Sequence, residues 1–596
     1  MKSKIEELFG ADLRSLAALR IGVALVLILD LCQRASDLEA HYSDFGVAPR
    51  SLVIDNLDSR WFVSLHLLSG AWQVQALLFL LAGVLAGALL IGYRTGIATV
   101  GSWILCVSLN ARNFHVVGGG DMLLRAVLFW SMFLPLGAYY SVDRAWARFA
   151  GKLPKRIVSW GTAAFAAQIL ALYWFSVLGK SGAEWWREGS AVYYALSIDY
   201  IVTPLGQWLL HLPPPVLRLA TRSVLAFEIV GPLLLFVPWF TGPVRTLAVF
   251  GFVALHLVFL FTLLVGLFPL IAIVSMLFFL PSWFWDGLLP QFCRAPRKPV
   301  TVYYDGDCGF CEKSVQLIKT FLLLPPSQIL PAQSNPAMAA VLRENNSWVV
   351  VDASGRQFLR YQGVIALARS ARLLVWLAPI LCFGPFERIG ERAYRYIADH
   401  RAVSCQVPAV GAAGDSALGL RPSAATGTIA MVMMVYMLVW NIANVRVTNF
   451  KIPERVRAVG NLVGLDQTWE MFAPFPAKDD GWYVIPGRLK NGRQIDLQRG
   501  GQEINWEKPK YIALTIKNHR WRKFFELLKK RDYLVPGYAS YLCRNWNRSH
   551  AGNERLEELE IVFLLEWTRP NFEYFEPRKL SLLKYRCAAA SAKSSS

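Results

Sequence analysis

Long apolar windows separated by short polar turns dominate the first 290 residues of this 596-residue chain. A window of about 19–20 apolar residues can cross the ~30 Å hydrocarbon core of a bilayer as a helix. Windows of that kind, or somewhat shorter, lie at about 14–32, 73–92, 97–111, 121–138, 159–179, 219–240, 246–265, 267–285 and 424–443. The pattern predicts a mainly α polytopic membrane protein with about nine transmembrane helices.

A different pattern begins at residue 298. Short β-prone runs at 299–304 and 347–352 alternate with helical stretches that begin near residues 308 and 363. Strands that alternate with helices indicate a small α/β domain, which we place at 298–405. This domain follows the transmembrane domain, 1–290, and is inserted before the last span.

Behind the inserted domain the chain is expected to cross the bilayer once more. An Ala-, Gly- and Ser-rich linker at 406–423 leads into the span at 424–443. We expect a basic α+β domain at 444–585 and a disordered tail at 586–596. The predicted elements of the basic domain are a hairpin turning at Asn491-Gly492, a helix within 519–531 and a strand at 559–567.

Charge is concentrated in the C-terminal part. The chain carries a net charge of +20, and residues from 444 onward contain 27 Lys and Arg against 17 Asp and Glu. Beside a membrane, a basic face suits anionic lipid headgroups better than nucleic acid. We therefore expect membrane lipids, and no nucleic acid, as partners; an ordinary solvated surface is the alternative.

Basic residues also bear on orientation. Lys2, Lys4 and Arg14 place the N-terminus in the cytoplasm by the positive-inside rule, and we expect a multi-pass protein of a bacterial inner membrane. Eight spans would return the chain to the cytoplasm before residue 298, and the ninth would carry 444–585 outside. Arg446 and Lys451, close behind the last span, argue the other way, so the side that holds each domain stays open.

The clearest chemical signature is a pair of cysteines, Cys308 and Cys311. The run TVYYDGDCGFC at 301–311 predicts a strand, an Asp-Gly turn and a helix that begins at the first cysteine. A helix N-terminus favours the thiolate, and the second sulfur lies one turn away, near enough to close a disulfide. We predict thiol–disulfide chemistry, with Asp305 as a candidate proton carrier and with Asp307 opposing the ionisation of Cys308.

Two other interpretations of this pair are open. The thiols can be reduced and inert in a degenerate domain, or they can bind a metal. A metal site lacks further ligands, because no second Cys or His pair stands at ligand spacing in the sequence.

The segment around the cysteines resembles the DCC family of thiol–disulfide oxidoreductase-like domains, a thioredoxin-fold group. Asp305, Gly306, Asp307, Cys308 and Cys311 match the family signature. The similarity continues through Pro331–Ser334, Trp348–Asp352, Gly355, Gly363 and Tyr394–Arg401. The resemblance implies a thioredoxin-like domain in which Cys308 attacks a disulfide or a peroxide and Cys311 resolves the mixed disulfide. It also implies a thiol or disulfide protein as substrate.

Polar residues interrupt the predicted spans, where they are costly and therefore candidate sites. Asp121 and Arg125 stand four residues apart, at the spacing of a helical ion pair. Lys180 follows an apolar helix, while Glu228 and His256 each interrupt a span. Ordinary structural roles are the alternative: Lys180 can reach out to the interface, and His256 can bond to a carbonyl in the core.

These positions together resemble the HTTM family, the membrane domain shared by vitamin K-dependent gamma-carboxylase and many bacterial proteins. The matching segments are Asn113–His115, Tyr140–Asp143, Tyr173–Lys180, Trp185, Gly189, His256, Gly266–Pro269 and Gln467–Phe472. In the carboxylase a lysine deprotonates reduced vitamin K, and a histidine lies near the carbanion.

The resemblance implies that Lys180 is the base and His115 the histidine near the carbanion. It makes Asn113, Trp185, Glu228 and His256 candidates for binding a reduced, vitamin K-like quinone. This chain has one lysine where the carboxylase has a pair, and the propeptide-binding region has no evident counterpart. Quinone binding or quinone chemistry is therefore the property that we carry over, in preference to carboxylation.

Two functions follow from the sequence. In the first, an integral membrane oxidoreductase links the Cys308/Cys311 pair to quinone chemistry in the membrane domain. In the second, the membrane domain is a non-catalytic anchor or lipid-binding scaffold, and the inserted domain senses the redox state.

Overall fold

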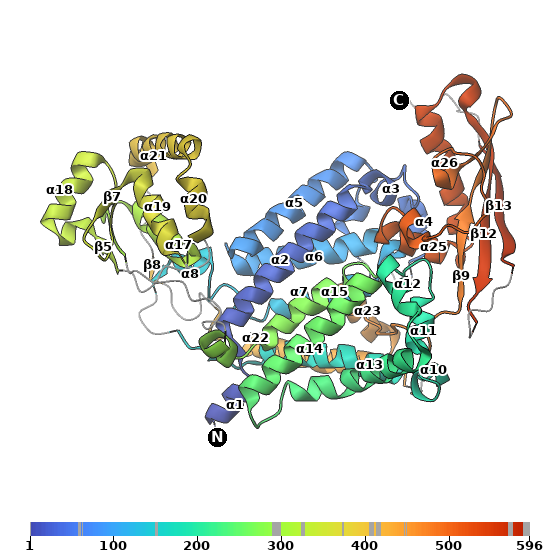
Figure 1. Cartoon of the computed structure of the whole chain (residues 1–596), viewed down its shortest axis with the longest axis horizontal. Helices are drawn as coiled ribbons and strands as arrows, with labels where there is room; N and C mark the ends of the chain where they lie inside the picture. Colours follow the sequence, from blue (N-terminus) through green and yellow to red (C-terminus); the bar gives the residue numbers. More distant parts are fainter. Residues whose placement is uncertain are drawn as a thin grey trace.

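A helical body with a different domain at each end makes up the protein (Figure 1). The structure, a computed structural model, describes residues 2–57, 61, 63–148, 153–288, 300–322, 328–371, 375–404, 411–412, 419–445, 448, 450–569 and 576–587. Most of the predicted linker at 406–423 and the tail beyond Cys587 lie outside the described residues.

Five helices in the described part of the chain are long and apolar enough to cross a membrane. They are α2 (Leu13–Ala35), α5 (Trp72–Ile91), α9 (Trp160–Gly179), α14 (Thr241–Thr262) and α22 (Ala424–Ala443). Each coincides with one of the predicted windows. Polar caps define where such helices begin: the Ser159 hydroxyl accepts the N–H of Thr162 at the start of α9.

The other four windows form helices that are shorter or less apolar. They are α6 (Thr95–Arg112), α7 (Gly119–Ser131), α13 (Pro214–Leu234) and α15 (Phe268–Met276). Helix α7 has only 13 residues, and α13 contains two arginines and Glu228. The count of about nine transmembrane helices is therefore not confirmed.

Short helices connect the long ones. They are α1 (Lys2–Phe9), α3 (Leu38–Tyr42), α4 (Arg50–Asp55), α8 (Val142–Ala145), α10 (Ala183–Trp186), α11 (Ala191–Leu196), α12 (Pro204–Leu210) and α23 (Glu454–Val463). A two-stranded sheet of β1 (Ala11–Asp12) and β3 (Arg156–Ile157) joins the start of α2 to the start of α9.

The inserted α/β domain is built on a four-stranded sheet in the order β5-β4-β6-β7. The strands are β4 (Thr301–Tyr304), β5 (Gln328–Pro331), β6 (Val349–Val351) and β7 (Gln357–Leu359). Strand β4 runs parallel to β5 and antiparallel to β6. The helices are α17 (Gly309–Leu322), α18 (Pro336–Asn345), α19 (Arg360–Ser370), α20 (Ala378–Leu381) and α21 (Gly384–Ser404). The predicted strands and helix starts are confirmed.

The C-terminal domain contains a five-stranded sheet that packs against helices. Its strands are β9 (Asp479–Val484), β10 (Pro486–Leu489), β11 (Gln494–Asp496), β12 (Leu556–Trp567) and β13 (Arg578–Arg586), and its helices are α24 (Ile512–Thr515), α25 (His519–Leu528) and α26 (Leu534–Ser549). The hairpin at Asn491-Gly492 is confirmed, and Gly492 takes the positive φ of +83° that the turn requires. Sequence analysis missed β13.

A disulfide joins the end of β13 to α26, between Cys587 and Cys543. Sequence analysis found only one close cysteine pair and did not predict this bond. Because β13 ends at Arg586 and Cys587 is bonded, the first two residues of the predicted tail, 586 and 587, are part of the C-terminal domain.

A buried charge cluster joins the C-terminal domain to the helical body. Arg520 of α25 pairs with Asp30 and Asp121, each at 2.6 Å. Arg34 pairs with the same two carboxylates, at 2.8 and 2.5 Å. All four side chains are 5% exposed or less, so two positive and two negative charges neutralise one another away from water. The predicted Asp121–Arg125 pair is wrong, since Arg125 pairs with Asp466 instead.

Candidate functional site

The first cysteine of the pair lies at the junction between strand and helix. Strand β4 ends at Tyr304, and Cys308 immediately precedes α17, whose Glu312 N–H donates to the Cys308 carbonyl at 3.1 Å. The side chain of Cys308 is 1% exposed. The sulfur therefore lies at the positive end of the α17 dipole, where a thiolate is favoured. In this structure Cys308 is disulfide-bonded.

Gln333 organises the turn before the cysteine. Its Nε2 donates to Asp305 and to Asp307, each at 3.0 Å, and its Oε1 accepts the N–H of Gly306, also at 3.0 Å. A Cβ on Gly306 would come within 2.8 Å of Gln333 and of Pro331, so this position requires glycine. Asp305 and Asp307 are thus held together beside the cysteine. Gln333 was part of the family resemblance but was not predicted as a site residue.

An apolar pocket of about 260 Å³ adjoins the second cysteine. Cys311 and Asp305 line it, and its other residues include Tyr304, Phe310, Val315, Trp348, Val364 and Tyr394. The pocket places a thiol and a carboxylate against a surface that can bind an apolar group of a substrate. The four predicted residues of the redox motif therefore lie around one site.

A second candidate site lies in the helical body, where Lys180 follows the last residue of α9. Its ammonium group pairs with the carboxylate of Glu228 in α13, and the two side chains are only 2% and 6% exposed. The same ammonium lies 4.6 Å from the centre of the Trp185 ring. Trp185 in turn donates its indole N–H to the Phe472 carbonyl at 2.9 Å. Lys180 is therefore buried and paired, and does not reach out to the interface.

This ion pair faces a cavity of about 370 Å³. Apart from Lys180 and Glu228 its walls are almost wholly apolar, with Leu196, Leu217, Leu255, Phe259, Phe268 and Met471 among them. The structure thus brings together three of the predicted membrane residues, Lys180, Trp185 and Glu228, around one apolar space.

The remaining predicted residues of the membrane domain lie elsewhere. His256 shares a 2.8 Å hydrogen bond with the Tyr173 hydroxyl and is not among the residues that line the cavity, although its neighbours Leu255 and Phe259 are. Asn113 donates to the His41 carbonyl at 2.8 Å. His115 bonds to Asn113 and, at 3.1 Å, to Tyr533 of the C-terminal domain. His115 therefore contacts the C-terminal domain, Asn113 bonds to His115 and to the His41 backbone, and neither residue lines the cavity at Lys180.

Neutral histidines at this domain boundary predict a pH dependence. Burial lowers the pKa of His41 to about 3 and that of His115 to about 4. In the unfolded chain the two histidines take up a proton near pH 6.5, whereas in the folded chain they stay neutral at that pH. The free energy of unfolding is therefore highest above pH 6.5 and decreases as the pH falls toward 4. The expected loss is about 1.4 kcal/mol per pH unit for each histidine.

The test is the melting temperature of the full chain in nanodiscs between pH 7.5 and pH 4.5. His41→Phe should reduce the acid sensitivity, because phenylalanine cannot be protonated. The ring centres of His41 and Trp521 are 4.5 Å apart, a contact that phenylalanine can keep, and neither nitrogen of the His41 ring has a hydrogen-bond partner among the described residues. An unchanged pH profile in this variant would contradict the assignment.

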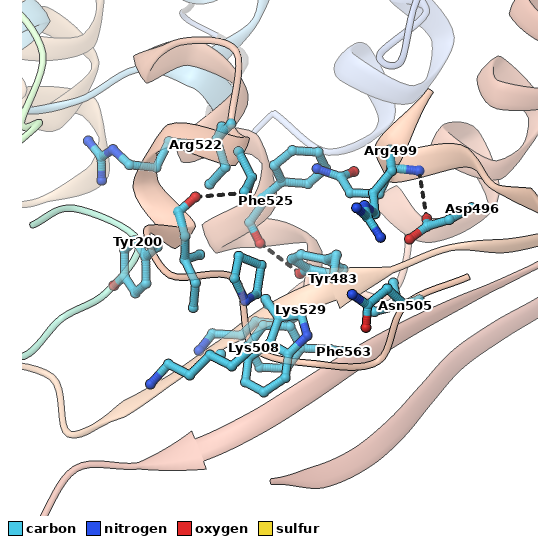
Figure 2. Close-up of a pocket in the computed structure, with 18 of the residues that line it drawn as sticks. Tyr200, Tyr483, Asp496, Arg499, Asn505, Lys508, Arg522, Phe525, Lys529 and Phe563 are labelled. Atoms are coloured by element: carbon cyan, nitrogen blue, oxygen red, sulfur yellow. Dashed lines mark hydrogen bonds between the residues drawn. The ribbon is translucent and has the colours of Figure 1, made fainter. Parts of the chain in front are cut away.

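A third cavity, of about 250 Å³, lies in the C-terminal domain (Figure 2). Tyr483 lines it and donates its hydroxyl to the Phe525 carbonyl at 2.9 Å. Its charged residues are largely engaged by the protein: Lys508 pairs with Asp199 and Glu566, and Lys529 pairs with Asp479. Sequence analysis missed this cavity, because its walls come from Tyr200, β9, the segment 505–516 and α25, which are far apart in the chain.

Comparison with known families bears on the inserted domain. Residues 302–406 match the family model of the DCC1-like thiol-disulfide oxidoreductases. No curated protein and no solved structure matches the chain. The match falls on the sheet and helices that hold Cys308 and Cys311. Over residues 302–406, this chain therefore carries a DCC1-like thiol-disulfide oxidoreductase domain.

Proposed function

We propose that this chain is an integral membrane thiol–disulfide oxidoreductase in which Cys308 is the attacking thiolate and Cys311 the resolving thiol. The observation that carries the proposal is the position of Cys308 at the head of α17, inside the matched domain. Helix dipole and backbone N–H groups at that position stabilise a negative sulfur.

The exchange proceeds in two balanced steps. The Cys308 thiolate attacks one sulfur of a substrate disulfide, forming a mixed disulfide and releasing the other substrate sulfur as a thiolate, which takes up a proton. The Cys311 thiolate then attacks the Cys308 sulfur and releases the second substrate thiolate, which is protonated in turn. The substrate gains two electrons and two protons, and Cys308 and Cys311 end as a disulfide. Asp305, which lines the Cys311 pocket, can carry the proton that Cys311 loses.

The redox domain is proposed to face the cytoplasm. Its α17 contacts the loop near the start of α2, where the Tyr140 hydroxyl donates to the Phe321 carbonyl at 3.1 Å and Arg20 donates to the Tyr140 carbonyl. The C-terminal domain contacts the other end of α2, where Lys517 pairs with Asp37 at 2.6 Å. Helix α2 has 23 residues, about 35 Å, and the two domains contact it at different positions, near Arg20 and near Asp37, so we place them toward opposite faces of the membrane.

The Cys543–Cys587 disulfide supports this orientation. Structural bonds of this kind persist in oxidising compartments, whereas disulfides in the cytosol are usually transient and catalytic, as we propose for Cys308, so the C-terminal domain suits the outer face. The N-terminus and the redox domain then lie on the cytoplasmic side of a bacterial inner membrane.

A membrane-impermeant thiol reagent tests the orientation. After mild reduction, Cys311 should be labelled in lysate and protected in intact spheroplasts. The control is Arg493→Cys, an exposed position in the β10–β11 hairpin, which should be labelled in both. Equal labelling of Cys311 in spheroplasts and lysate would place the redox domain outside and refute the orientation.

A second proposal concerns the apolar cavity at Lys180, which we propose binds a reduced quinone. The buried ion pair supports it: a charged pair in the wall of the cavity can bond to the polar ring substituents of a quinone while the apolar walls contact its ring. A bound quinol supplies an ionisable hydroxyl, and Lys180 and Glu228 are placed to hold and pass a proton. Lys180 follows α9, on the side of the C-terminal domain, so the cysteines and this cavity cannot exchange electrons directly.

Replacing the ion pair tests quinone binding. Lys180→Met alone leaves Glu228 as an uncompensated buried charge, whereas Lys180→Met combined with Glu228→Gln should restore folding. The double variant is expected to bind a short-chain naphthoquinol about 10- to 100-fold more weakly than the unmodified protein, because hydrogen bonds to charged groups are worth about 1.5–3 kcal/mol.

The measurement is calorimetric titration of the quinol into protein-containing nanodiscs. A folded double variant that binds as tightly as the unmodified protein would contradict the role of the ion pair. An unmodified protein that does not bind the quinol would favour the membrane domain as a non-catalytic scaffold.

A further inference from the structure

The redox domain exposes five large apolar side chains within residues 376–389, which we name the 376–389 strip. It consists of Trp376, Ile380, Phe383, Phe386 and Ile389, from the segment 375–377, helix α20 and the first turns of α21. These side chains are 62%, 45%, 62%, 50% and 61% exposed. Exposed apolar patches of this kind mark a surface that is covered by something else.

The strip lies on the outer face of α20 and α21. The inner face of α21 already packs against α19. On α21, Glu387 accepts a hydrogen bond from Gln362, and Glu391 pairs with Arg360 of α19. Phe386 and Ile389 lie on a different side of the helix from these contacts and are left exposed. The domain's own fold therefore does not account for the strip.

Basic side chains run beside the apolar ones. Arg388, Arg392 and Arg395 are exposed and, being spaced i, i+4 and i+7, share one side of α21 next to Ile389. An aromatic and aliphatic stripe bordered by arginines is the pattern of helices that lie in the membrane interface, with the arginines at anionic headgroups.

The position of the strip beside the transmembrane helices indicates lipid as its partner. Figure 1 shows α20 on the side of the redox domain that is turned toward the transmembrane helices. The domain is held near the ends of those helices by the contact of Tyr140 with Phe321, and by Lys313 lying 5.3 Å from the ring centre of Trp146. A strip of this composition, held near the ends of the spans, faces lipid.

We propose that the 376–389 strip inserts into the adjoining lipid leaflet, with Arg388 and Arg392 binding anionic lipid phosphates. The redox domain is then fixed at the membrane surface by two attachments, one to α8 and its neighbouring loop and one to lipid. This inference does not depend on the chemistry of Cys308.

Lipid contact is tested on the full-length protein in nanodiscs. An environment-sensitive fluorescent amino acid replaces Phe383 or, in a second variant, Ile389. The control carries it at Ala340, an exposed position in α18 of the same domain. Figure 1 shows helix α18 on the side of the domain that is turned away from the helical body. Emission from positions 383 and 389 should shift to shorter wavelength and be strongly quenched by brominated lipid, while emission from position 340 should be unaffected.

Charge reversal tests the headgroup contact. Arg388→Glu with Arg392→Glu should weaken the quenching at position 383 in discs that contain anionic lipid more than in discs of zwitterionic lipid. Unquenched emission at both 383 and 389 would overturn the proposal. Blue-shifted emission without quenching would also overturn it, since the strip would then be covered by protein, such as a second copy of the chain or a substrate peptide.

Discussion

Cys308→Ser is expected to reduce disulfide-exchange activity on the order of 10³-fold or more, which is the largest effect of any single change in this chain. The attacking species is a thiolate, and a serine hydroxyl at the same helix terminus is neither ionised nor able to form a mixed disulfide. The measurement is the rate at which the reduced full-length protein, in nanodiscs, reduces a model disulfide peptide.

Cys311→Ser is the matched variant, because it removes a thiol from the same turn and leaves Cys308 in place. It should accumulate a mixed disulfide between Cys308 and the substrate, visible as a mass increase on non-reducing analysis. Retention of full activity in Cys308→Ser, or accumulation of the adduct on Cys311 instead, would contradict the roles assigned to the two sulfurs.

Arg520→Leu is expected to destabilise the full chain by about 3–5 kcal/mol, the usual cost of leaving buried charge without its partner. Asp30 and Asp121 would then share Arg34 as their one remaining cation within the cluster described above. Since Arg520 belongs to α25 and the two aspartates to α2 and α7, the C-terminal domain should detach from the helical body. Chemical denaturation in nanodiscs or mild detergent measures the change.

Two companion variants make this result specific. Arg548→Leu removes the pair with Glu39 at the same boundary, in which the side chains are 54% and 40% exposed, and it should cost less than about 1 kcal/mol. Adding Asp121→Asn to Arg520→Leu should recover part of the lost stability, because one negative charge is then removed. If Arg520→Leu were no more destabilising than Arg548→Leu, the cluster would not hold the domains together.

The local elements of the fold were predictable from the sequence, because their signals lie within short windows. The alternation around Cys308, the Asn491-Gly492 turn and five long apolar windows each specify one element without knowledge of the rest. The redox motif belongs to this class, since strand, turn and helix start all fall within residues 301–311.

Pairings between distant segments were not predictable. Asp121 and Arg125 have the spacing of a helical pair, yet Asp121 pairs with Arg520, 399 residues away, because burial at the domain boundary brings a second cation to it. The partner of Lys180 and the disulfide of Cys543 depend in the same way on tertiary packing. His115 shows the same limit: its residue type suggested chemistry, whereas its position makes it a contact of Tyr533.

The account rests on Cys308 being an activated thiolate that exchanges with its neighbour one turn away. The most direct measurement equilibrates the full-length protein in nanodiscs with glutathione buffers of graded potential and maps the disulfides by peptide mass, while alkylation rates across pH report the thiol pKa of Cys308. We predict a Cys308–Cys311 disulfide that forms and opens reversibly, and a Cys308 pKa below the ~8.5 of free cysteine. A Cys308 that titrates like free cysteine and does not pair with Cys311 at any potential would contradict the account.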